Sequence, residues 1–192
     1  MPLLMACSSR IIAILPGAQK KKTIYVSSCH IWSAMVFVMK QKINTDPGEF
    51  PAPTLVEVNG VELEVFEAGP KTGGKPVVLC HGWPEHAFSW RYQVPVLAAA
   101  GYHVIVPNQR GYGNSTSPTE ITDYDIEHLS GDLIGLLDHF GYKDATFVGH
   151  DWGAMVVWWL SLLHPGRVNG LVNLSVPYQV RGDRPWIQWM EE

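Results

Sequence analysis

The pattern Gly149-x-Asp151-x-Gly153 places a carboxylate between two glycines, where one apolar run ends and an apolar helical segment begins. This arrangement is typical of the nucleophile elbow, a sharp strand-to-helix turn that holds its central side chain in strained geometry and exposes it. A carboxylate at a helix start is favoured by the helix dipole and stays ionised, as a nucleophile must. We therefore interpret Asp151 as a candidate catalytic nucleophile. The alternative is an ordinary helix N-cap, which requires neither glycine.

A second motif, HGWPE, spans residues 81–85 and directly follows another apolar run. A loop in this position can aim the backbone N–H of Trp83 at the same point as the N–H of Trp152. The two donors would form an oxyanion hole beside Asp151. The alternative is a plain Gly-Pro turn. The other residues predicted to line the site are His81, Gly82, Pro84, Glu85 and His150.

Strands and helices alternate along the part of the chain that must position these motifs. Continuous apolar runs, typical of strands covered on both faces, predict strands at 76–80, 103–108, 145–151 and 168–176. Helices are expected at 90–100, 125–140 and 154–163. The second helix has an apolar stripe with Asp132 on the opposite, polar side, and Thr122 with Asp125 resembles a capping box at its start.

The alternation of strands and helices predicts an α/β fold with a mostly parallel sheet. Asn59 and Gly60, between two alternating runs, predict an antiparallel hairpin that opens it. In such sheets ligands bind at the carboxyl ends of the strands, which is where HGWPE, NQRGYGNS and GHDWG fall. The domain is expected to cover residues 51–177. Residues 1–50 are poorly patterned and are interpreted as an N-terminal extension, with Met39 as one candidate for the natural start.

Composition and charge exclude several classes of function. The formal net charge of −4 provides no clustered basic face for nucleic acid. Neither the eight histidines nor the three cysteines have metal-ligand spacing, so we expect neither a metal nor a cofactor. The odd set of cysteines indicates a reducing compartment, and we predict a cytoplasmic location. Residues 23–39 are short of the roughly 20 apolar residues of a spanning helix. Targeting by residues 1–40 is the open alternative.

Five motifs occur together: HGWPE (81–85), SWRYQ (89–93), RGYGNS (110–115), GHDWG (149–153) and LLHPGRV (162–168). As a set they resemble the α/β-hydrolase superfamily and, within it, the soluble epoxide hydrolases, over about residues 54–192. The resemblance implies an α/β-hydrolase fold and a reaction in which Asp151 attacks an epoxide carbon to form an alkyl-enzyme ester. Water then hydrolyses the ester to a diol, while Trp83 and Trp152 stabilise the charge on its carbonyl oxygen.

Two further interpretations stay open beside this one. Haloalkane dehalogenases share the aspartate and the following tryptophan, but their loop commonly carries Asn or Glu where Trp83 stands, which favours an epoxide substrate. A non-enzymatic binding or interaction protein could keep the elbow as scaffold only. The chain also departs from the family at Asn108, where an aspartate usually precedes Arg110. A charged partner for Arg110 is therefore in question, with consequences for the loop rather than for the chemistry.

Parts of the family's machinery have no counterpart in the sequence. The only histidine after Asp151 is His164, which a helix would place about 20 Å from the site, and NLSVP (173–177) holds no carboxylate. Residues 178–192 match the start of the family's cap, which supplies two tyrosines that protonate the epoxide oxygen. We expect the last strands and the cap to be missing, and the chain to be inactive as it stands. The strand at 168–176 would then be an exposed edge that favours self-association.

Overall fold

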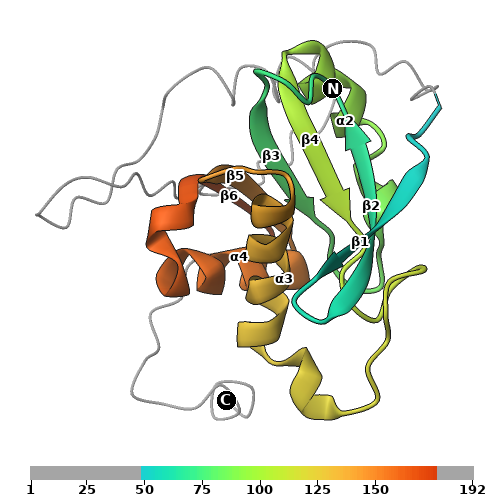
Figure 1. Ribbon diagram of the computed structural model, residues 1–192, viewed down its shortest axis with the longest axis vertical. Coiled ribbons are helices and arrows are strands. Elements are labelled where there is room, and N and C mark those ends of the chain that lie inside the picture. The colour runs from blue at the N-terminus through green and yellow to red at the C-terminus, as the bar shows by residue number, and fades with distance from the viewer. Residues whose placement is uncertain (1–48, 177–192) are drawn as a thin grey trace, which may run out of the picture.

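The computed structural model describes residues 49–176, which form one six-stranded sheet in the order β1-β2-β4-β3-β5-β6 (Figure 1). The strands are β1 (Pro53–Val58), β2 (Val61–Ala68), β3 (Lys75–Cys80), β4 (Tyr102–Pro107), β5 (Ala145–His150) and β6 (Val168–Leu174). β2 is antiparallel to both β1 and β4, and the other pairs are parallel. The predicted fold class is confirmed. The predictions for residues 1–48 and 177–192 lie outside the described residues.

The hairpin that opens the domain turns where the sequence predicts. Asn59 and Gly60 join β1 to β2 with φ values of 47° and 77°. A type I′ turn requires positive φ at both positions, and asparagine and glycine tolerate it best. The hairpin then continues through β2 into the antiparallel pairing with β4, so it lies against the parallel part of the sheet.

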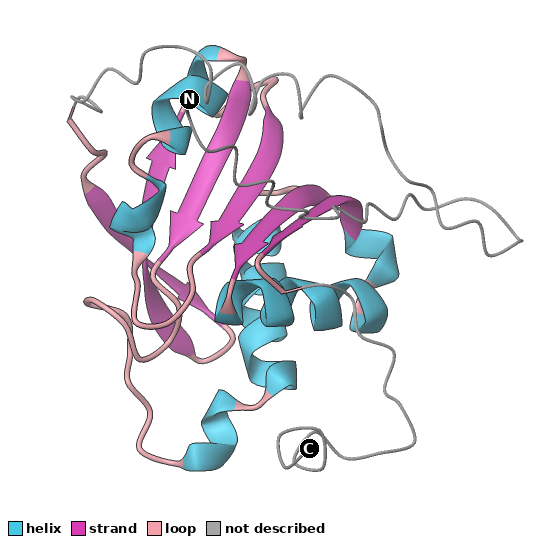
Figure 2. Cartoon of the chain, turned by 180° about the vertical axis from the view of Figure 1, so that it is seen from behind, coloured by secondary structure: helices cyan, strands magenta, loops and turns pink. Residues whose placement is uncertain are grey.

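The sheet lies between two helical layers (Figure 2). The helices are η1 (Ala87–Trp90), α2 (Gln93–Ala99), η2 (Ile121–Tyr124), α3 (Ile126–His139), α4 (Trp152–Leu163) and η3 (Pro165–Arg167). Along β3, Val78 and Cys80 point into a core shared with α3 and α4, whereas Val77 and Leu79 point into a core shared with η1 and α2. Both faces of the central strands are therefore covered, which explains their continuous apolar runs.

Four details differ from the sequence prediction. The helix expected at 90–100 is split into η1 and the shorter α2, and β6 ends at Leu174 because Ser175 has a φ of 71°. The cap of α3 is Asp125 itself, whose carboxylate accepts a hydrogen bond of 2.8 Å from the backbone N–H of His128. Thr122 belongs to η2 instead. Asp132, expected on the polar side of α3, is buried because it pairs with Arg110.

Three findings bear on the sequence-based exclusions. Across residues 49–176, no helix has both the length and the apolar character needed to cross a membrane. The same residues contain no group of three or more histidine, cysteine or acidic side chains arranged to hold a metal ion. Cys80 is a free thiol buried in β3, and burial raises its pKa. Residues 23–39 lie outside the described range.

Candidate active site

Asp151 sits in the turn between β5 and α4 with φ 52° and ψ −120°, a strained conformation for any residue except glycine. A β-carbon at Gly149 would collide with the backbone of Gly153 and Ala154, and one at Gly153 would collide with the carbonyl oxygens of Cys80 and His81. The close approach of strand and helix thus requires both glycines of the motif. The strained geometry and the close packing are those of a nucleophile elbow.

The carboxylate of Asp151 faces the backbone N–H of Trp83 in the HGWPE loop and that of Trp152, the first residue of α4. The N–H of Trp83 donates to Oδ1 at 3.0 Å, and the N–H of Trp152 also faces the carboxylate. These two donors, followed by the nearby charge of His150, lower the pKa of Asp151 although burial opposes them. Trp152 is the first residue of α4, whereas an N-cap side chain accepts from the second or third N–H of a helix, and the side chain of Asp151 makes no such capping hydrogen bond. An ordinary N-cap therefore does not account for this residue.

Glu85 links the HGWPE loop to the elbow. Its Oε2 accepts a hydrogen bond of 3.1 Å from the N–H of Gly82 and lies 2.9 Å from Nδ1 of His150. Burial opposes ionisation of Glu85, but the hydrogen bonds from His150 and Gly82 outweigh it and lower its pKa. Gly82 must be glycine, because a β-carbon there would lie 2.6 Å from Cβ of Asp151. The structure thus brings Gly82, Glu85 and His150 together beside Asp151.

The remaining predicted residues differ in their exposure to solvent. The indoles of Trp83 and Trp152 are 64% and 55% exposed, and Pro84, which follows a cis peptide bond, is also exposed. His81 is fully buried beneath the loop, where Nε2 accepts a hydrogen bond of 3.1 Å from the N–H of Gln109. Burial lowers the pKa of His81. His81 therefore supports the loop from below rather than facing the crevice.

The loop after β4 contributes a residue that the sequence reasoning missed. The ring of Tyr112 packs edge-on against His81 with 4.7 Å between ring centroids. Burial and then the charge of Asp151 raise the pKa of Tyr112. The only signal was positional: RGYGNS follows the carboxyl end of β4, which is next to β3 in the sheet.

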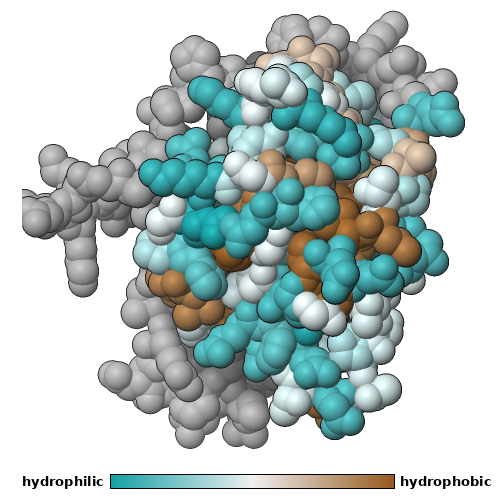
Figure 3. Space-filling view, viewed as in Figure 1, coloured by the Kyte–Doolittle hydropathy of each residue, from teal (hydrophilic) through white to brown (hydrophobic). Residues whose placement is uncertain are grey.

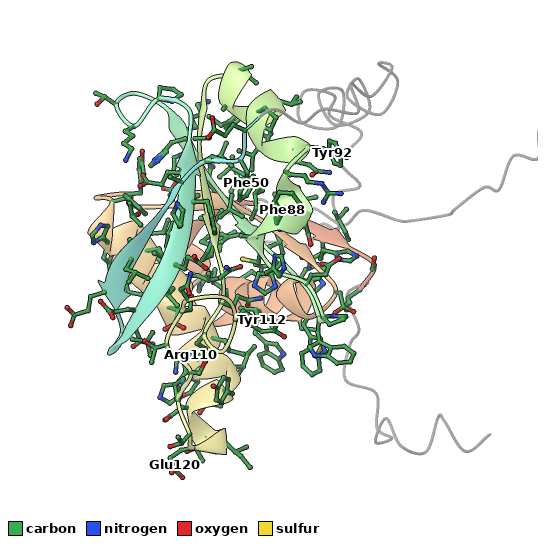
Figure 4. All side chains as sticks on the ribbon, turned by 90° about the vertical axis from the view of Figure 1, so that its right-hand side faces the viewer. Phe50, Phe88, Tyr92, Arg110, Tyr112 and Glu120 are labelled. Atoms are coloured by element: carbon green, nitrogen blue, oxygen red, sulfur yellow. The ribbon has the colours of Figure 1, made fainter. Side chains whose placement is uncertain are left out.

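Arg110, which is labelled in Figure 4, lies in the same loop as Tyr112. It pairs with a charged side chain, Asp132. Its Nε and Nη2 donate to the two carboxylate oxygens of Asp132 at 2.7 and 2.6 Å, and Nη1 donates to the carbonyl of Asp123 at 2.6 Å. Asn108, which replaces the family's aspartate, instead donates to Glu64 at 2.6 Å and accepts from the N–H of Ala87 at 2.7 Å. The charge at Arg110 is thus neutralised from α3.

The chain belongs to the α/β-hydrolase family, since the model of the alpha/beta hydrolase fold matches residues 75–192. Epoxide hydrolase A of Mycobacterium tuberculosis is 54% identical over 135 residues, which are 70% of this chain and 42% of that protein. An epoxide hydrolase of Caballeronia sordidicola is 42% identical over 71% of this chain and 41% of its own length.

Solved structures of epoxide hydrolases are also similar to this chain. The crystal structure of epoxide hydrolase A from Mycobacterium thermoresistibile superposes with a TM-score of 0.70 at 50% identity, over 73% of this chain and 44% of that chain. Epoxide hydrolase I of potato gives a TM-score of 0.66 at 35% identity, over 72% of this chain and 44% of that one. The chain therefore spans somewhat over two fifths of these structures.

Proposed function

We propose that Asp151 is the nucleophile of an epoxide hydrolase-type reaction. The observation that carries the proposal is the strained elbow in which backbone N–H groups keep the carboxylate ionised. Because Trp83 holds Oδ1, the other oxygen is the one free to attack. A bond forms from that oxygen to an epoxide carbon, the carbon–oxygen bond of the ring breaks, and the released alkoxide takes a proton from water.

The backbone N–H groups of Trp83 and Trp152 act in the second half of the reaction, in which the ester is hydrolysed. Water attacks the carbonyl carbon of the Asp151 ester, and negative charge develops on Oδ1. The bond from the carbonyl carbon to the ester oxygen then breaks, and the diol leaves with that oxygen. One proton of the attacking water goes to the diol and the other to solvent, while its oxygen completes the carboxylate. Trp83 already donates to Oδ1 in the resting structure, at 3.0 Å. Each such donor stabilises the charged intermediate by about 3 kcal/mol. The proposed roles of Trp83 and Trp152 as oxyanion-hole donors rest on this geometry.

An epoxide is the preferred substrate class over a haloalkane, with the same attack displacing halide in the second case. The relatives at 40% identity and above are named epoxide hydrolases, and the residue after Gly82 is aromatic. A role as a binding or interaction protein needs no ionised and strained aspartate.

Mass spectrometry of the chain incubated with an aryl epoxide in H₂¹⁸O tests the proposal. If the ester persists, the peptide that carries Asp151 gains the mass of the epoxide; if the ester is hydrolysed, the Asp151 carboxylate gains ¹⁸O. The Asp151→Asn variant is the matched control and should show neither change. The measurement needs one attack at Asp151 and no turnover, so the expected inactivity of the chain as a catalyst does not prevent it. Labelling of both proteins alike, or of neither after prolonged incubation, would contradict the nucleophile. A parallel incubation with a 1-haloalkane that labelled Asp151 faster than the epoxide would favour the dehalogenase alternative.

We propose further that the chain self-associates along β6 and the outer face of α4. Within residues 49–176, β6 pairs only with β5. Apolar groups reach the surface in patches among polar ones (Figure 3), and α4 exposes Trp152, Met155, Trp159, Leu162 and Leu163. Size-exclusion chromatography over a concentration series should show oligomers that Trp159→Lys reduces. A monomer at every concentration would overturn this proposal.

We also propose a cytoplasmic location, supported by the free thiol of Cys80 in the core. A reducing compartment keeps such thiols unpaired. Fractionation of the native host with an antibody against the folded domain is the direct measurement. Recovery in a membrane or secreted fraction would contradict the proposal.

A further inference from the structure

The peptide unit between Gly82 and Trp83 connects Asp151 to His81, which lies buried beneath the loop. Its N–H, from Trp83, donates to Oδ1 of Asp151 at 3.0 Å. Its carbonyl, from Gly82, accepts a hydrogen bond of 3.2 Å from the N–H of Glu85 and lies 2.9 Å from Nδ1 of His81. A trans peptide is planar, with N–H and C=O pointing in opposite directions. Any group that holds the Gly82 carbonyl therefore also aims the Trp83 N–H.

The hydrogen bonds around His81 determine which of its ring nitrogens carries the proton. The backbone N–H of Gln109 points at Nε2 over 3.1 Å, so Nε2 must present its lone pair. A neutral imidazole then carries its hydrogen on Nδ1, which donates to the Gly82 carbonyl. The side-chain amide of Gln109 donates to the carbonyl of His81 at 2.8 Å, and Tyr112 packs against the ring. Gln109 thus fixes both the tautomer and the ring.

We propose that His81 is a positioning residue that aims the Trp83 N–H at Asp151 by donating from Nδ1 to the Gly82 carbonyl. It touches neither the nucleophile nor the substrate, and it acts through the plane of one peptide. The inference rests on the proposed function only in the role given to the Trp83 N–H. Rotation of this peptide would turn the N–H away from Oδ1 and replace it with a carbonyl oxygen, which repels the charge that develops there.

The same arrangement makes the loop sensitive to acid. Protonation adds a hydrogen to Nε2, which then faces the N–H of Gln109, so two donors oppose each other. The titratable groups around His81 are Glu85 and His86 on its own loop and Tyr112 from the loop after β4. Burial lowers the pKa of His81, with Glu85 favouring the proton and His86 opposing it. The neutral form is therefore the one that holds the loop.

Two substitutions of His81 each preserve the hydrogen bond of one ring nitrogen and remove that of the other. In His81→Asn, the side-chain amide can occupy the place of Nδ1 and keep a donor toward the Gly82 carbonyl. In His81→Gln, the side chain can reach the place of Nε2 and keep an acceptor for the Gln109 N–H. A role in general packing predicts the same result for both variants. The proposal predicts opposite results at two backbone amides.

Amide hydrogen exchange of the full chain, followed by NMR, reads out both positions. In His81→Gln the Trp83 amide should exchange about tenfold faster than in the wild type, which is the effect of losing one ordinary hydrogen bond. In His81→Asn it should stay close to wild type while the Gln109 amide exchanges faster. Equal exchange of Trp83 in the two variants would overturn the proposal.

The wild-type chain supplies a test that needs no substitution. The ¹⁵N shifts of the His81 ring should show the hydrogen on Nδ1 and a lone pair on Nε2, and a hydrogen on Nε2 would overturn the proposal even if both variants failed to fold. Neither measurement requires Asp151 to react. The expected exchange pattern without any labelling of Asp151 would therefore refute the proposed function and leave the positioning role intact.

Discussion

Asp151 and Asp132 are both carboxylates that accept hydrogen bonds, but their partners differ in charge. Asp132 accepts from two nitrogens of the Arg110 guanidinium, and both side chains are buried. Asp151 accepts from the backbone N–H of Trp83, with that of Trp152 beside it, and remains partly open to solvent. A full positive charge neutralises Asp132 completely. The partial charges of N–H groups favour the ionised form of Asp151, and this half-exposed carboxylate, unlike that of Asp132, has no full counter-charge.

The backbone conformations of Asp132 and Asp151 also differ. Asp132 lies within the regular helix α3, whereas Asp151 has a φ of 52° at the start of α4. Positive φ at a non-glycine residue is unfavourable and persists only where the surroundings impose it. The packing of Gly149 and Gly153 imposes it here. The pair of residues therefore contrasts a carboxylate that stabilises the fold with one that the fold must hold in place.

The largest change in the free energy of unfolding should come from removing the carboxylate of Asp132. Asp132→Ala leaves the guanidinium of Arg110 buried without its counter-charge, and we expect the free energy of unfolding to fall by about 3–5 kcal/mol. Urea denaturation followed by circular dichroism measures it. Asp138→Ala on the same helix is the matched control, because Asp138 pairs with Arg167 at an exposed site and should contribute at most about 1 kcal/mol. Equal losses in the two variants would refute the distinction.

A smaller loss of stability should come from adding a side chain in the turn between β5 and α4. Gly153→Ala adds a β-carbon against the carbonyl oxygens of Cys80 and His81, and overpacking of this kind costs about 1–3 kcal/mol. Gly166→Ala is the control, because a β-carbon there meets nothing within 4 Å. Thermal unfolding of the two variants provides the comparison. A Gly153→Ala chain as stable as Gly166→Ala would mean that the elbow is looser than the structure indicates.

The sequence predicts local features of this site well and distant pairings poorly. The Asp151 elbow and the Asn59 turn follow from backbone requirements that a few adjacent residues express. The burial of Asp132 does not, because its partner lies 22 positions earlier in a loop. The periodicity of α3 shows which face is apolar but not that Arg110 reaches Asp132. The tautomer of His81 likewise depends on Gln109, 28 positions away.

The smallest change in stability should accompany the largest change in chemistry. Asp151→Asn removes the proposed nucleophile, yet asparagine is among the residues that best tolerate positive φ. The amide oxygen can still accept from the N–H of Trp83 but carries no charge, so the free energy of unfolding near pH 7 should fall by at most about 1 kcal/mol.

Acid should separate Asp151→Asn from the wild type. The pKa of Asp151 is lowered in the folded chain by the N–H groups of Trp83 and Trp152. The stabilisation it confers is therefore present above the unfolded pKa of about 3.9 and is lost as the pH falls through the folded pKa. Urea midpoints below about pH 4 should consequently fall less steeply with acid in Asp151→Asn than in the wild type. Parallel acid profiles would show that the N–H groups do not favour the ionised carboxylate, which would remove the contrast with Asp132.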